Sequence, residues 1–473
     1  MDVKINGGSS LNGVIYSSPS KSYSHRAFFL SLIMHKPTRL ERPLRTGDVT
    51  RTVKACSRLG GRIAQVGRDA MSLDPPKILS VPLDAIDCGN SGTTVRILAA
   101  LTLILEGEMK LRGVFFTRER PIHDLLKSLE TIGTVWKPID PEGTLTEGIS
   151  IKTETVTENE IRIPGDVSSQ YITGLIIAAC ALLYRKEQAA EKGFSANCFT
   201  IKSTTKVKSF PYVLITKEVC EDFGFSIDVE EMAGGRKKIV IKSPSHFMID
   251  EMEHRYQIAG DFSSAAFMIA AGALFANNYD VEIKNLSMKT NQGDKEIITI
   301  LSEMGAEIVT NKDSVEVHGR QKVFDVFEDE KRYIPYLKGQ EIDFQNIPDL
   351  FPILAVVSSY GNSKSILGNA EHVRHKETDR IEVLARELSK FNVKLTEKTD
   401  GLIVQPYQAR DGSEDVMVEH NEDHRIIMAL TIFCLGINSK TVTIHDISAV
   451  SDSYPEFFSD LQKLGADIEL LDN

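Results

Sequence analysis

Apolar positions recur along this chain at two different spacings, which is typical of a mixed α/β protein. Residues Lys237–Lys242 and Ser314–His318 alternate polar and apolar side chains, so we predict that each forms a strand with one buried face. Ile381, Leu384 and Leu388 instead recur at the spacing of a helix with one buried face. The pattern therefore predicts short strands interspersed with helices.

One local pattern recurs six times, in which a helix-like segment is followed by a glycine or asparagine and then a short strand. Gly and Asn favour the left-handed conformation that commonly ends a helix. The six corners fall at Gly60, Gly133, Gly224, Gly305, Asn392 and Gly465. Their spacing of roughly 80 residues indicates six copies of one structural unit, although this corner is also common in any α/β protein.

A second repeat supports six copies. The sequence GDVSS at Gly165–Ser169 returns as GDFSS at Gly260–Ser264, and small and apolar residues follow both. We therefore expect α/β units arranged three to a lobe. We expect the lysine-rich segment Gly234–His246 to be a crossing between the lobes.

Composition places the chain among ordinary globular proteins. It has 473 residues, of which 42% are hydrophobic and 26% charged, enough for two large domains or three smaller ones. These values exclude a disordered chain, a collagen, a coiled coil and a disulfide scaffold. The formal net charge of −11 makes generic nucleic-acid binding a poor hypothesis, so anionic ligands would need local clusters of cations.

Sequence features favour a soluble cytoplasmic protein. The six cysteines are scattered and form no CxxC pair, which indicates reduced thiols. The first residues lack the apolar core of a signal peptide. The longest apolar stretch, Ile172–Tyr184, is too short to span a bilayer, so we expect no membrane partner.

Several predicted helix starts combine hydroxyl groups with cations, a combination suited to anions because free backbone N–H groups point at the ligand. Lys21, Ser22 and Arg26 open one apolar helix, and Gly92 allows close backbone approach at the start of another. Arg120 precedes a third helix start. Each segment could alternatively be a capped surface helix, and the spacing around Gly92 does not match a P-loop.

Carboxylates occur near three further predicted helices. Glu377 stands ahead of the apolar stripe, and we expect Lys376 and Arg380 to be neighbours on one helical face beside it. Such a carboxyl could act as a general acid or could simply belong to a salt-bridged first turn. Asp343 and Asp349 precede a second apolar helix, where either could be only a cap and Asp343 could also be a base. Asp423 opens a third helix together with His424 and Arg425. No histidine or cysteine falls at zinc-ligand spacing, so we expect no metal.

Taken together, these segments resemble the 5-enolpyruvylshikimate-3-phosphate synthase family. The matching stretches follow the family's order from Ser20 to Phe458 and thus cover nearly the whole chain. They are KSYSHR, GNSGTTVR, RERP, VSSQY, FSSAAF, IPD, KETDR, DHR and YPEFF. The combination of KETDR, DHR and SSQY is specific.

The resemblance implies an inside-out α/β barrel fold with two lobes. Each lobe would hold three repeated βαβ-type units whose helix N-termini face a cleft between the lobes. We expect residues 1–19 with 257–473 to form a discontinuous lobe that carries the phosphoenolpyruvate site and catalytic carboxylates. Residues 20–256 would form the lobe that binds shikimate 3-phosphate.

The resemblance also implies a reaction without a cofactor. The enolpyruvyl group of phosphoenolpyruvate would pass to the 5-hydroxyl of shikimate 3-phosphate, with release of phosphate, in aromatic amino acid biosynthesis. The partners are then these two small molecules, and the family's usual monomer is our expectation. By resemblance, glyphosate should enter the phosphoenolpyruvate pocket beside Gly92.

Site residues follow from the matching positions. The resemblance implies that Asp343 accepts a proton, that Glu377 donates one and that Lys21 takes part in catalysis. Shikimate 3-phosphate would contact Lys21, Ser22, Arg26, Ser168, Ser169, Gln170, Ser209, Asp343, His372 and Lys376, with Tyr212 a less secure match. Phosphoenolpyruvate would contact Lys21, Gly92, Arg120, Gln170, Arg380 and Arg425.

Two positions depart from the family pattern. Asp452 stands where many members have lysine, and His372 stands where many have asparagine. These changes keep open a carboxyvinyl transferase that acts on another phosphorylated cyclitol. A transferase for UDP-N-acetylglucosamine is a weaker alternative, because the segment around Arg120 lacks that enzyme's cysteine. A non-catalytic anion-binding paralogue would have lost Asp343, Glu377 or Lys21, and all three are present.

Overall fold

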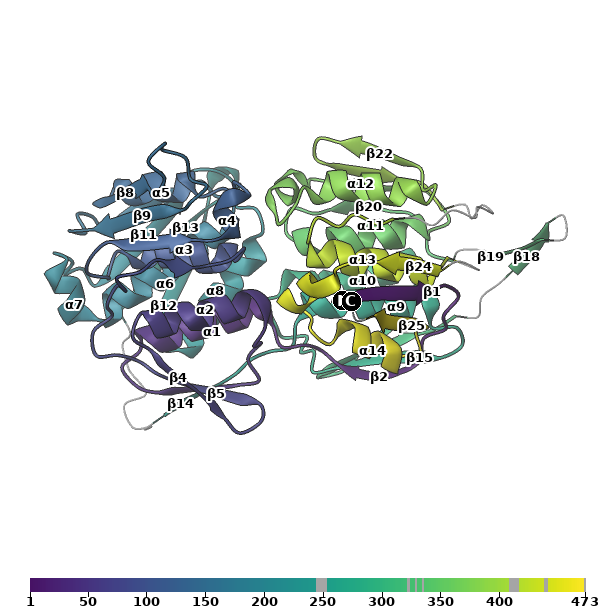
Figure 1. Ribbon diagram of the computed structural model, residues 1–473, viewed down its shortest axis with the longest axis horizontal. Helices are drawn as coiled ribbons and strands as arrows, with labels where there is room; N and C mark the ends of the chain where they lie inside the picture. Colours follow the sequence, from purple (N-terminus) through teal and green to yellow (C-terminus); the bar gives the residue numbers. More distant parts are fainter. Residues whose placement is uncertain are drawn as a thin grey trace. The chain divides into compact units, whose positions relative to one another are not determined.

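The computed structural model divides into two compact units, each with its own core (Figure 1). Unit 1 comprises Met1–Ser18 with Ala259–Asn473, and unit 2 comprises Pro19–Ile258. The structure describes residues 1–243, 253–320, 324–327, 330–333, 336–407, 417–437 and 441–471. Side chains of 324–327 and 330–333 lie outside this description. No described helix is both long enough and apolar enough to cross a membrane.

Unit 2 contains three repeats, each built around one buried helix. The first holds α1 (Lys21–Ile33), β3 (Thr38–Glu41), α2 (Gly47–Arg58), β4 (Arg62–Val66) and β5 (Ala70–Asp74). The second holds β6 (Ile86–Asp87), α3 (Gly92–Leu101), β7 (Met109–Arg112), α4 (Val114–Thr117), α5 (His123–Glu130), β8 (Thr134–Pro138) and β9 (Ile149–Thr153). The third holds β10 (Glu160–Ile163), α6 (Ser169–Tyr184), α7 (Lys186–Glu191), β11 (Cys198–Ser203), α8 (Phe210–Asp222), β12 (Ser226–Met232) and β13 (Arg236–Lys242), and β14 (His254–Gln257) then joins the first sheet.

Unit 1 repeats the same order of elements. Its chain runs through β1 (Asp2–Asn6), β2 (Gly13–Tyr16), α9 (Phe262–Phe275), β15 (Asp280–Lys284), α10 (Ile297–Met304), β16 (Glu307–Thr310) and β17 (Ser314–His318). It continues with β18 (Phe324–Phe327), β19 (Glu330–Tyr333), β20 (Glu341–Asp343), α11 (Phe351–Ser359), β21 (Ser365–Gly368), α12 (Arg380–Lys390), β22 (Leu395–Lys398) and β23 (Gly401–Val404). The last elements are α13 (His424–Leu435), β24 (Thr441–Ile444), α14 (Phe457–Lys463) and β25 (Ile468–Leu471).

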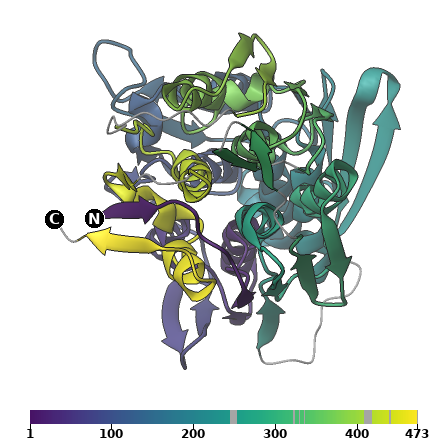
Figure 2. The ribbon, with the colours of Figure 1, turned by 90° about the vertical axis from the view of Figure 1, so that its right-hand side faces the viewer.

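Strand pairing shows that the repeats are real. Among the described residues, five four-stranded sheets share one pattern, in which a parallel pair is followed by two antiparallel pairs. The sixth sheet has the order β24-β1-β25, and the N-terminal strand β1 takes the place that β5 has in its own sheet. The two chain ends therefore complete one repeat together, and Figures 1 and 2 show β1 beside the C-terminal strands.

All six predicted corners have left-handed backbones. Gly60, Gly133, Gly224, Gly305 and Gly465 have φ between 91° and 110°, and Asn392 has φ 63°. Each follows an outer helix and precedes a strand, namely β4, β8, β12, β16, β22 and β25. Glycine adopts these angles without strain, and asparagine tolerates them better than most residues. The six corners therefore have the backbone that the repeat predicted.

The inner helices are buried on all sides. Every residue of α9 and α13 is buried. In α6, which contains the apolar stretch Ile172–Tyr184, 14 residues are buried. Helices that are apolar all round lie in cores rather than on surfaces. The outer helix α12 is instead amphipathic, and Ile381, Leu384 and Leu388 are fully buried as the stripe predicted.

The expected crossing at Gly234–His246 is wrong in its described part. Residues Arg236–Lys242 form β13, which pairs with β11 and β12 inside unit 2. Lysines alternate there with Ile239 and Ile241, whose side chains are buried, so the segment is a half-buried strand. The chain passes from unit 2 to unit 1 after Ile258.

The segment after α6 ties neighbouring repeats of unit 2 together. Arg185 is 2% exposed, and its guanidinium donates hydrogen bonds to main-chain oxygens at the end of α1 and before β6. The acceptors are the carbonyls of Leu32, Ile33, Met34, Pro76 and Lys77. Gln188 of α7 binds the carbonyls of Leu79 and Ile104 in the same way. These side chains satisfy carbonyls that a helix end or loop leaves without a partner.

A buried chain of hydrogen bonds joins the first two repeats. His25 Nδ1 lies 2.7 Å from Thr52 Oγ1, which lies 2.7 Å from Thr94 Oγ1. The pKa of His25 is lowered to about 3, mainly by burial, while Asp48 acts to raise it and Lys21 and Arg26 act to lower it. The imidazole is therefore neutral in the folded protein.

This burial predicts acid sensitivity. An unfolded histidine titrates near pH 6.5, so stability that is fully present above pH 6.5 is lost as the pH falls toward 3. Between pH 7 and pH 5, the unfolding free energy of the wild type should fall by about 2 kcal/mol more than that of the variant His25→Gln. Urea unfolding of both proteins at the two pH values measures this difference. If the unfolding free energies of the two proteins fall equally, protonation of His25 does not destabilise the folded protein.

Candidate functional site

Polar residues gather at the first turns of the buried helices in both units. The sequence places a small polar or acidic residue at each of these starts, where it can bind free backbone N–H groups. Ser91 caps α3, Ser168 caps α6, Asp261 caps α9 and Asp423 caps α13 through their side chains. The starts of α3, α6 and α13 therefore fix the positions of Gly92, Ser168, Ser169, Gln170 and Arg425.

In unit 2, Lys21 begins α1 and is only partly exposed. Its Nζ lies 2.9 Å from Asp48 Oδ2 in the first turn of α2, and the two side chains are 17% and 15% exposed. Asp48 was not singled out by the sequence, since the two residues come from different helices. This acidic neighbour holds the ammonium group of Lys21 in place.

Arg26 lies deeper than a substrate contact was expected to lie. It is 2% exposed, and burial lowers its pKa to about 10. Its guanidinium donates to Thr216 Oγ1 at 2.8 Å, to Thr173 Oγ1 at 3.1 Å and to the carbonyls of Ser22 and Tyr212. Most of its donors thus bind protein groups, so Arg26 positions the backbone at Ser22 and Tyr212.

Gly92, Arg120 and Gln170 lie together in unit 2. A Cβ at Gly92 would be 2.7 Å from Arg96 Nη1, 3.1 Å from Gln170 Oε1 and 3.2 Å from Arg120 Nη2. Arg120 donates to the carbonyl of Asn90 at 2.6 Å, which holds it beside the α3 start. Two guanidiniums and a helix start around one glycine make a suitable site for an anion.

Arg96 is a member of this group that sequence analysis missed. It is 3% exposed, and it hydrogen-bonds Gln170 Oε1 and the carbonyl of Pro121. Its position one helical turn after Gly92 could have suggested the contact, because residues at i and i+4 lie on the same helix face. Ser168 and Ser169 occupy the α6 start beside Gln170, and Ser209 directly precedes α8 with φ 55°.

In unit 1, Asp349 is surrounded by three cations. Its carboxylate lies 3.4 Å from Lys376 Nζ, 3.0 Å from Arg380 Nη1 and 3.3 Å from Arg425 Nη2. The side chain is 14% exposed and lies just before α11. Asp349 is therefore the point at which these three cations meet.

Arg380 joins three carboxylates. It is 1% exposed, and it contacts Asp423 at 2.8 Å, Glu377 at 2.7 Å and Asp349 at 3.0 Å. Burial alone would raise the pKa of Asp423, but Arg380 holds it below its usual value. The same three carboxylates raise the pKa of Arg380 against the effect of its burial. The cluster is therefore a network of compensated buried charges.

Removal of this arginine should be costly, because it leaves Asp423 buried with an uncompensated charge. We expect Arg380→Met to lower the unfolding free energy of unit 1 by about 3–5 kcal/mol, as measured by urea unfolding. The matched control is Arg62→Met, which removes an exposed ion pair with Asp74 and should cost less than about 1 kcal/mol. Similar losses in the two variants would contradict the role of Arg380.

Helix α12 starts later than the sequence suggested. The side chain of Asp379 accepts hydrogen bonds from Ile381 N and Glu382 N at 3.1 Å each, so the helix begins at Arg380. Lys376 and Arg380 are therefore not neighbours on one helical turn, which corrects our expectation. They meet instead at Asp349, and Glu377 lies in the segment that precedes the helix.

Asp343 lies apart from these ion pairs. It is the last residue of β20 and is exposed, and its Oδ1 accepts hydrogen bonds from Gln345 N at 2.8 Å and Asn369 Nδ2 at 3.0 Å. His372 is 6% exposed and lies in a short 3-10 turn, Glu371–His375, that precedes Lys376. Sequence analysis gave a catalytic role to Asp343 and none to Asp349, yet it is Asp349 that lies among the cations.

A second buried acid lies close to Arg425. Arg425 Nη1 donates to the carbonyl of Ser263 at 3.3 Å, and the hydroxyl of Ser263 donates to Asp294. Burial, and secondarily Asp349, raise the pKa of Asp294 to about 7. Neither Ser263 nor Asp294 was predicted as a site residue, since they precede and follow β15 and only the fold brings them together.

Comparisons with known proteins identify the family. A profile of the family described as EPSP synthase (3-phosphoshikimate 1-carboxyvinyltransferase) matches residues 5–461. The 3-phosphoshikimate 1-carboxyvinyltransferase of Methanococcus vannielii is 36% identical over 470 residues, 98% of each chain. That of Methanocaldococcus jannaschii is 34% identical over 461 residues, 97% of each chain.

Solved structures share the fold. EPSP synthase from Acinetobacter baumannii covers 100% of both chains with a TM-score of 0.73 at 21% identity. The enolpyruvyl transferase NikO from Streptomyces tendae gives a TM-score of 0.68 at 16% identity, over 99% of this chain and 98% of its own. The expected two-lobe inside-out α/β fold is thus confirmed. The chain belongs to the EPSP synthase family.

Proposed function

We propose that this chain transfers the enolpyruvyl group of phosphoenolpyruvate to the 5-hydroxyl of shikimate 3-phosphate, in aromatic amino acid biosynthesis. The observation that carries this proposal is the 33–36% identity, over nearly the full length, to proteins named for that reaction. The ion cluster around Asp349 and Arg380 supports it, because both substrates are anions.

The proposed chemistry is an addition followed by an elimination. The 5-oxygen of the acceptor loses its proton and bonds to C2 of phosphoenolpyruvate, while the methylene carbon C3 gains a proton. The tetrahedral intermediate then loses phosphate, and the new methyl group gives up a proton to restore the double bond. Each step needs a positioned acid or base and charged donors, and no cofactor is required.

Two carboxylates are candidates for the base that removes the proton from the 5-hydroxyl of the acceptor. The resemblance assigned this role to Asp343, which is exposed and bonded by neutral amides. We propose Asp349 as the stronger candidate, because it is surrounded by Lys376, Arg380 and Arg425, which the resemblance assigns to the two substrates. Glu377, bound to Arg380 at 2.7 Å, is the proposed proton donor.

Residues of both units are proposed to contact the two anionic substrates. For shikimate 3-phosphate we propose Ser22, Ser168, Ser169, Gln170, Ser209, His372 and Lys376, with Arg26 as the residue that holds the backbone at Ser22. For phosphoenolpyruvate we propose Gly92, Arg120, Arg380 and Arg425. Lys21 would contact both substrates, and its partner Asp48 would orient it.

Gly92→Ala provides a local test of the proposed phosphoenolpyruvate contact. The new methyl group would lie 2.7 Å from Arg96 Nη1, so the ends of Arg96, Gln170 and Arg120 must shift. We expect the KM for phosphoenolpyruvate to rise about tenfold, equivalent to about 1.4 kcal/mol. Inhibition by glyphosate should weaken as well.

The control for this variant is the KM for shikimate 3-phosphate, which should change much less. Steady-state kinetics with each substrate varied in turn would separate the two effects. Equal changes in both KM values, or none in either, would contradict a phosphoenolpyruvate contact at Gly92.

We further propose that the enzyme acts as a monomer in the cytoplasm. All six cysteines are free thiols, and five of them are buried, which supports a reducing compartment. Light scattering of the purified protein would test the monomer, since a dimer would double the measured mass.

Mass spectrometry of the product tests the identity of the acceptor. Incubation with phosphoenolpyruvate and shikimate 3-phosphate should yield an enolpyruvyl ether of shikimate 3-phosphate. UDP-N-acetylglucosamine serves as a parallel acceptor and should give no product. Transfer to a different phosphorylated cyclitol but not to shikimate 3-phosphate would overturn the proposed substrate, and His372 and Asp452 would then be the first residues to replace.

A further inference from the structure

The outer face of one sheet in unit 1 carries an unusual group of ionisable side chains. In this sheet β17 lies between β15 and β16, and Asp280 of β15 and Glu307 of β16 both stand opposite His318 of β17. Val281, Ile283, Val315 and Val317 alternate with these positions and are fully buried. Since successive side chains of a strand point to opposite faces, the ionisable residues share the outer face.

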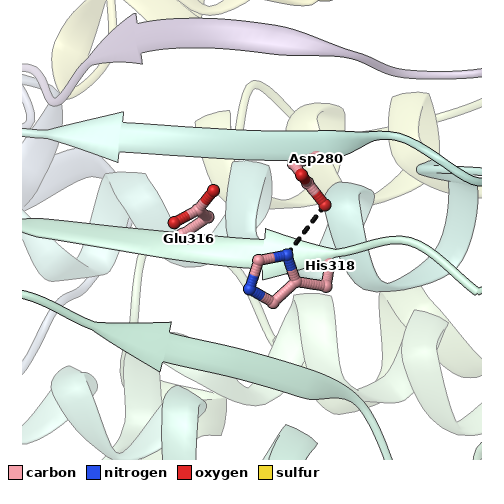
Figure 3. Close-up of side chains that lie close together, drawn as sticks. All are labelled: Asp280, Glu316 and His318. Atoms are coloured by element: carbon pink, nitrogen blue, oxygen red, sulfur yellow. Dashed lines mark hydrogen bonds and ion pairs between the residues drawn. The ribbon is translucent and has the colours of Figure 1, made fainter.

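Three of these side chains converge. His318 Nδ1 lies 2.8 Å from Asp280 Oδ1, and Glu316 stands two positions before His318 on the same face of β17 (Figure 3). One ligand atom from each of the three residues lies within 4.8 Å of the other two. Among the described residues, this is the one group of at least three His, Cys, Asp or Glu side chains that meets this criterion.

The spacing is close to that of a metal site. Imidazole nitrogen and carboxylate oxygens bind Zn²⁺ at about 2.0–2.2 Å, so two such ligand atoms lie at most about 4.4 Å apart. A small change of side-chain torsions would bring all three atoms to one ion. Asp280 lies on β15, and Glu316 and His318 lie on the adjacent strand β17, so strand pairing holds all three backbones in place. Little backbone movement is therefore needed to bind an ion.

The surrounding charges also favour a cation. Glu282 stands directly opposite Glu316 across the strand pair, and Glu307 lies on the other side of His318. Like charges opposite one another destabilise a sheet. A bound cation would relieve this accumulation of negative charge.

We propose that Asp280, Glu316 and His318 bind a divalent first-row transition-metal ion, for which Zn²⁺ is the first probe. One nitrogen and two carboxylate oxygens suit such an ion, and water would complete its coordination. The ion would link β15 to β17, so its role is to stabilise the sheet. This site could not be predicted from sequence, because residues 280 and 318 meet only through strand pairing.

Calorimetric titration of the full-length protein with zinc chloride tests the proposal. The wild type should bind one equivalent and unfold at a higher temperature with zinc present. His318→Ala and Glu316→Gln should each weaken binding at least tenfold, and two separate variants guard against a folding defect in one. Equal affinity in wild type and both variants would overturn the proposal.

Two further variants serve as controls. His445 forms a pair with Asp2 at 2.6 Å and belongs to no such three-residue group among the described residues, so His445→Ala should leave zinc binding unchanged. Cys198 is the one cysteine that is only partly buried. Loss of binding in Cys198→Ser together with normal binding in His318→Ala would assign the zinc to a thiol and contradict the proposal.

Discussion

Replacement of Glu377 by glutamine is expected to lower turnover by about 10²–10⁴-fold, the usual contribution of general acid–base catalysis. The amide keeps the size of the side chain, and its oxygen can still accept the hydrogen bond from Arg380. It cannot deliver a proton to the methylene carbon of phosphoenolpyruvate. The structure around Arg380 should therefore survive, and only the chemical step should fail.

The control for this variant is Glu382→Gln. Glu382 lies on α12 near Glu377, but its carboxylate is 53% exposed and pairs with Arg386. Its replacement should leave turnover unchanged. Calorimetry should show that Glu377→Gln still binds shikimate 3-phosphate with nearly normal affinity. Normal turnover in Glu377→Gln would remove Glu377 from the mechanism.

Asp349→Asn should have an effect of similar size, and Asp343→Asn should have a much smaller one. Asp349 contacts Lys376, Arg380 and Arg425, so its charge lies where the anionic substrates are expected to bind. Asp343 is exposed and accepts hydrogen bonds only from amide groups among its described partners. If Asp349 is the base, its amide variant should lose about 10²–10⁴-fold in turnover.

The two variants decide between the candidate bases. The pH profile of kcat should separate loss of a base from loss of structure, because the variant that lacks the base should lose the acidic limb of the profile. Urea unfolding of Asp349→Asn should check that the ion network remains folded. A large loss of turnover in Asp343→Asn and a small one in Asp349→Asn would support the assignment that the resemblance implied.

The repeat could be predicted from sequence because it depends on local backbone chemistry. A glycine or asparagine after a helix reports a left-handed backbone directly, and all six corners have it. The alternation in Ser314–His318 likewise coincides with the bounds of β17. That β1 completes the last sheet could not be predicted, because pairing between the two chain ends leaves no local signal.

The network around Arg380 could be predicted only in part. Arg380, Lys376 and Glu377 lie close in sequence and were singled out, but the buried partner Asp423 had been considered only as part of a helix start. Asp349 gained its importance from three cations on other segments. A single sequence reveals residue types and periodicity, whereas these ion pairs depend on how the repeats pack.

The start of α12 shows how side-chain capping limits periodicity arguments. The apolar stripe of Ile381, Leu384 and Leu388 was correct, yet it could not tell where the helix begins. Asp379 bonds two backbone N–H groups and sets the start at Arg380. Lys376 and Glu377 consequently belong to the bend between the 3-10 turn Glu371–His375 and the helix, and both contact the ion network from there.

Phosphate release from phosphoenolpyruvate, measured with and without shikimate 3-phosphate, tests the proposed activity most directly. The account predicts rapid release that requires shikimate 3-phosphate and falls by orders of magnitude in Glu377→Gln. Release that is absent with shikimate 3-phosphate, or equal without it, would contradict the proposed enolpyruvyl transfer.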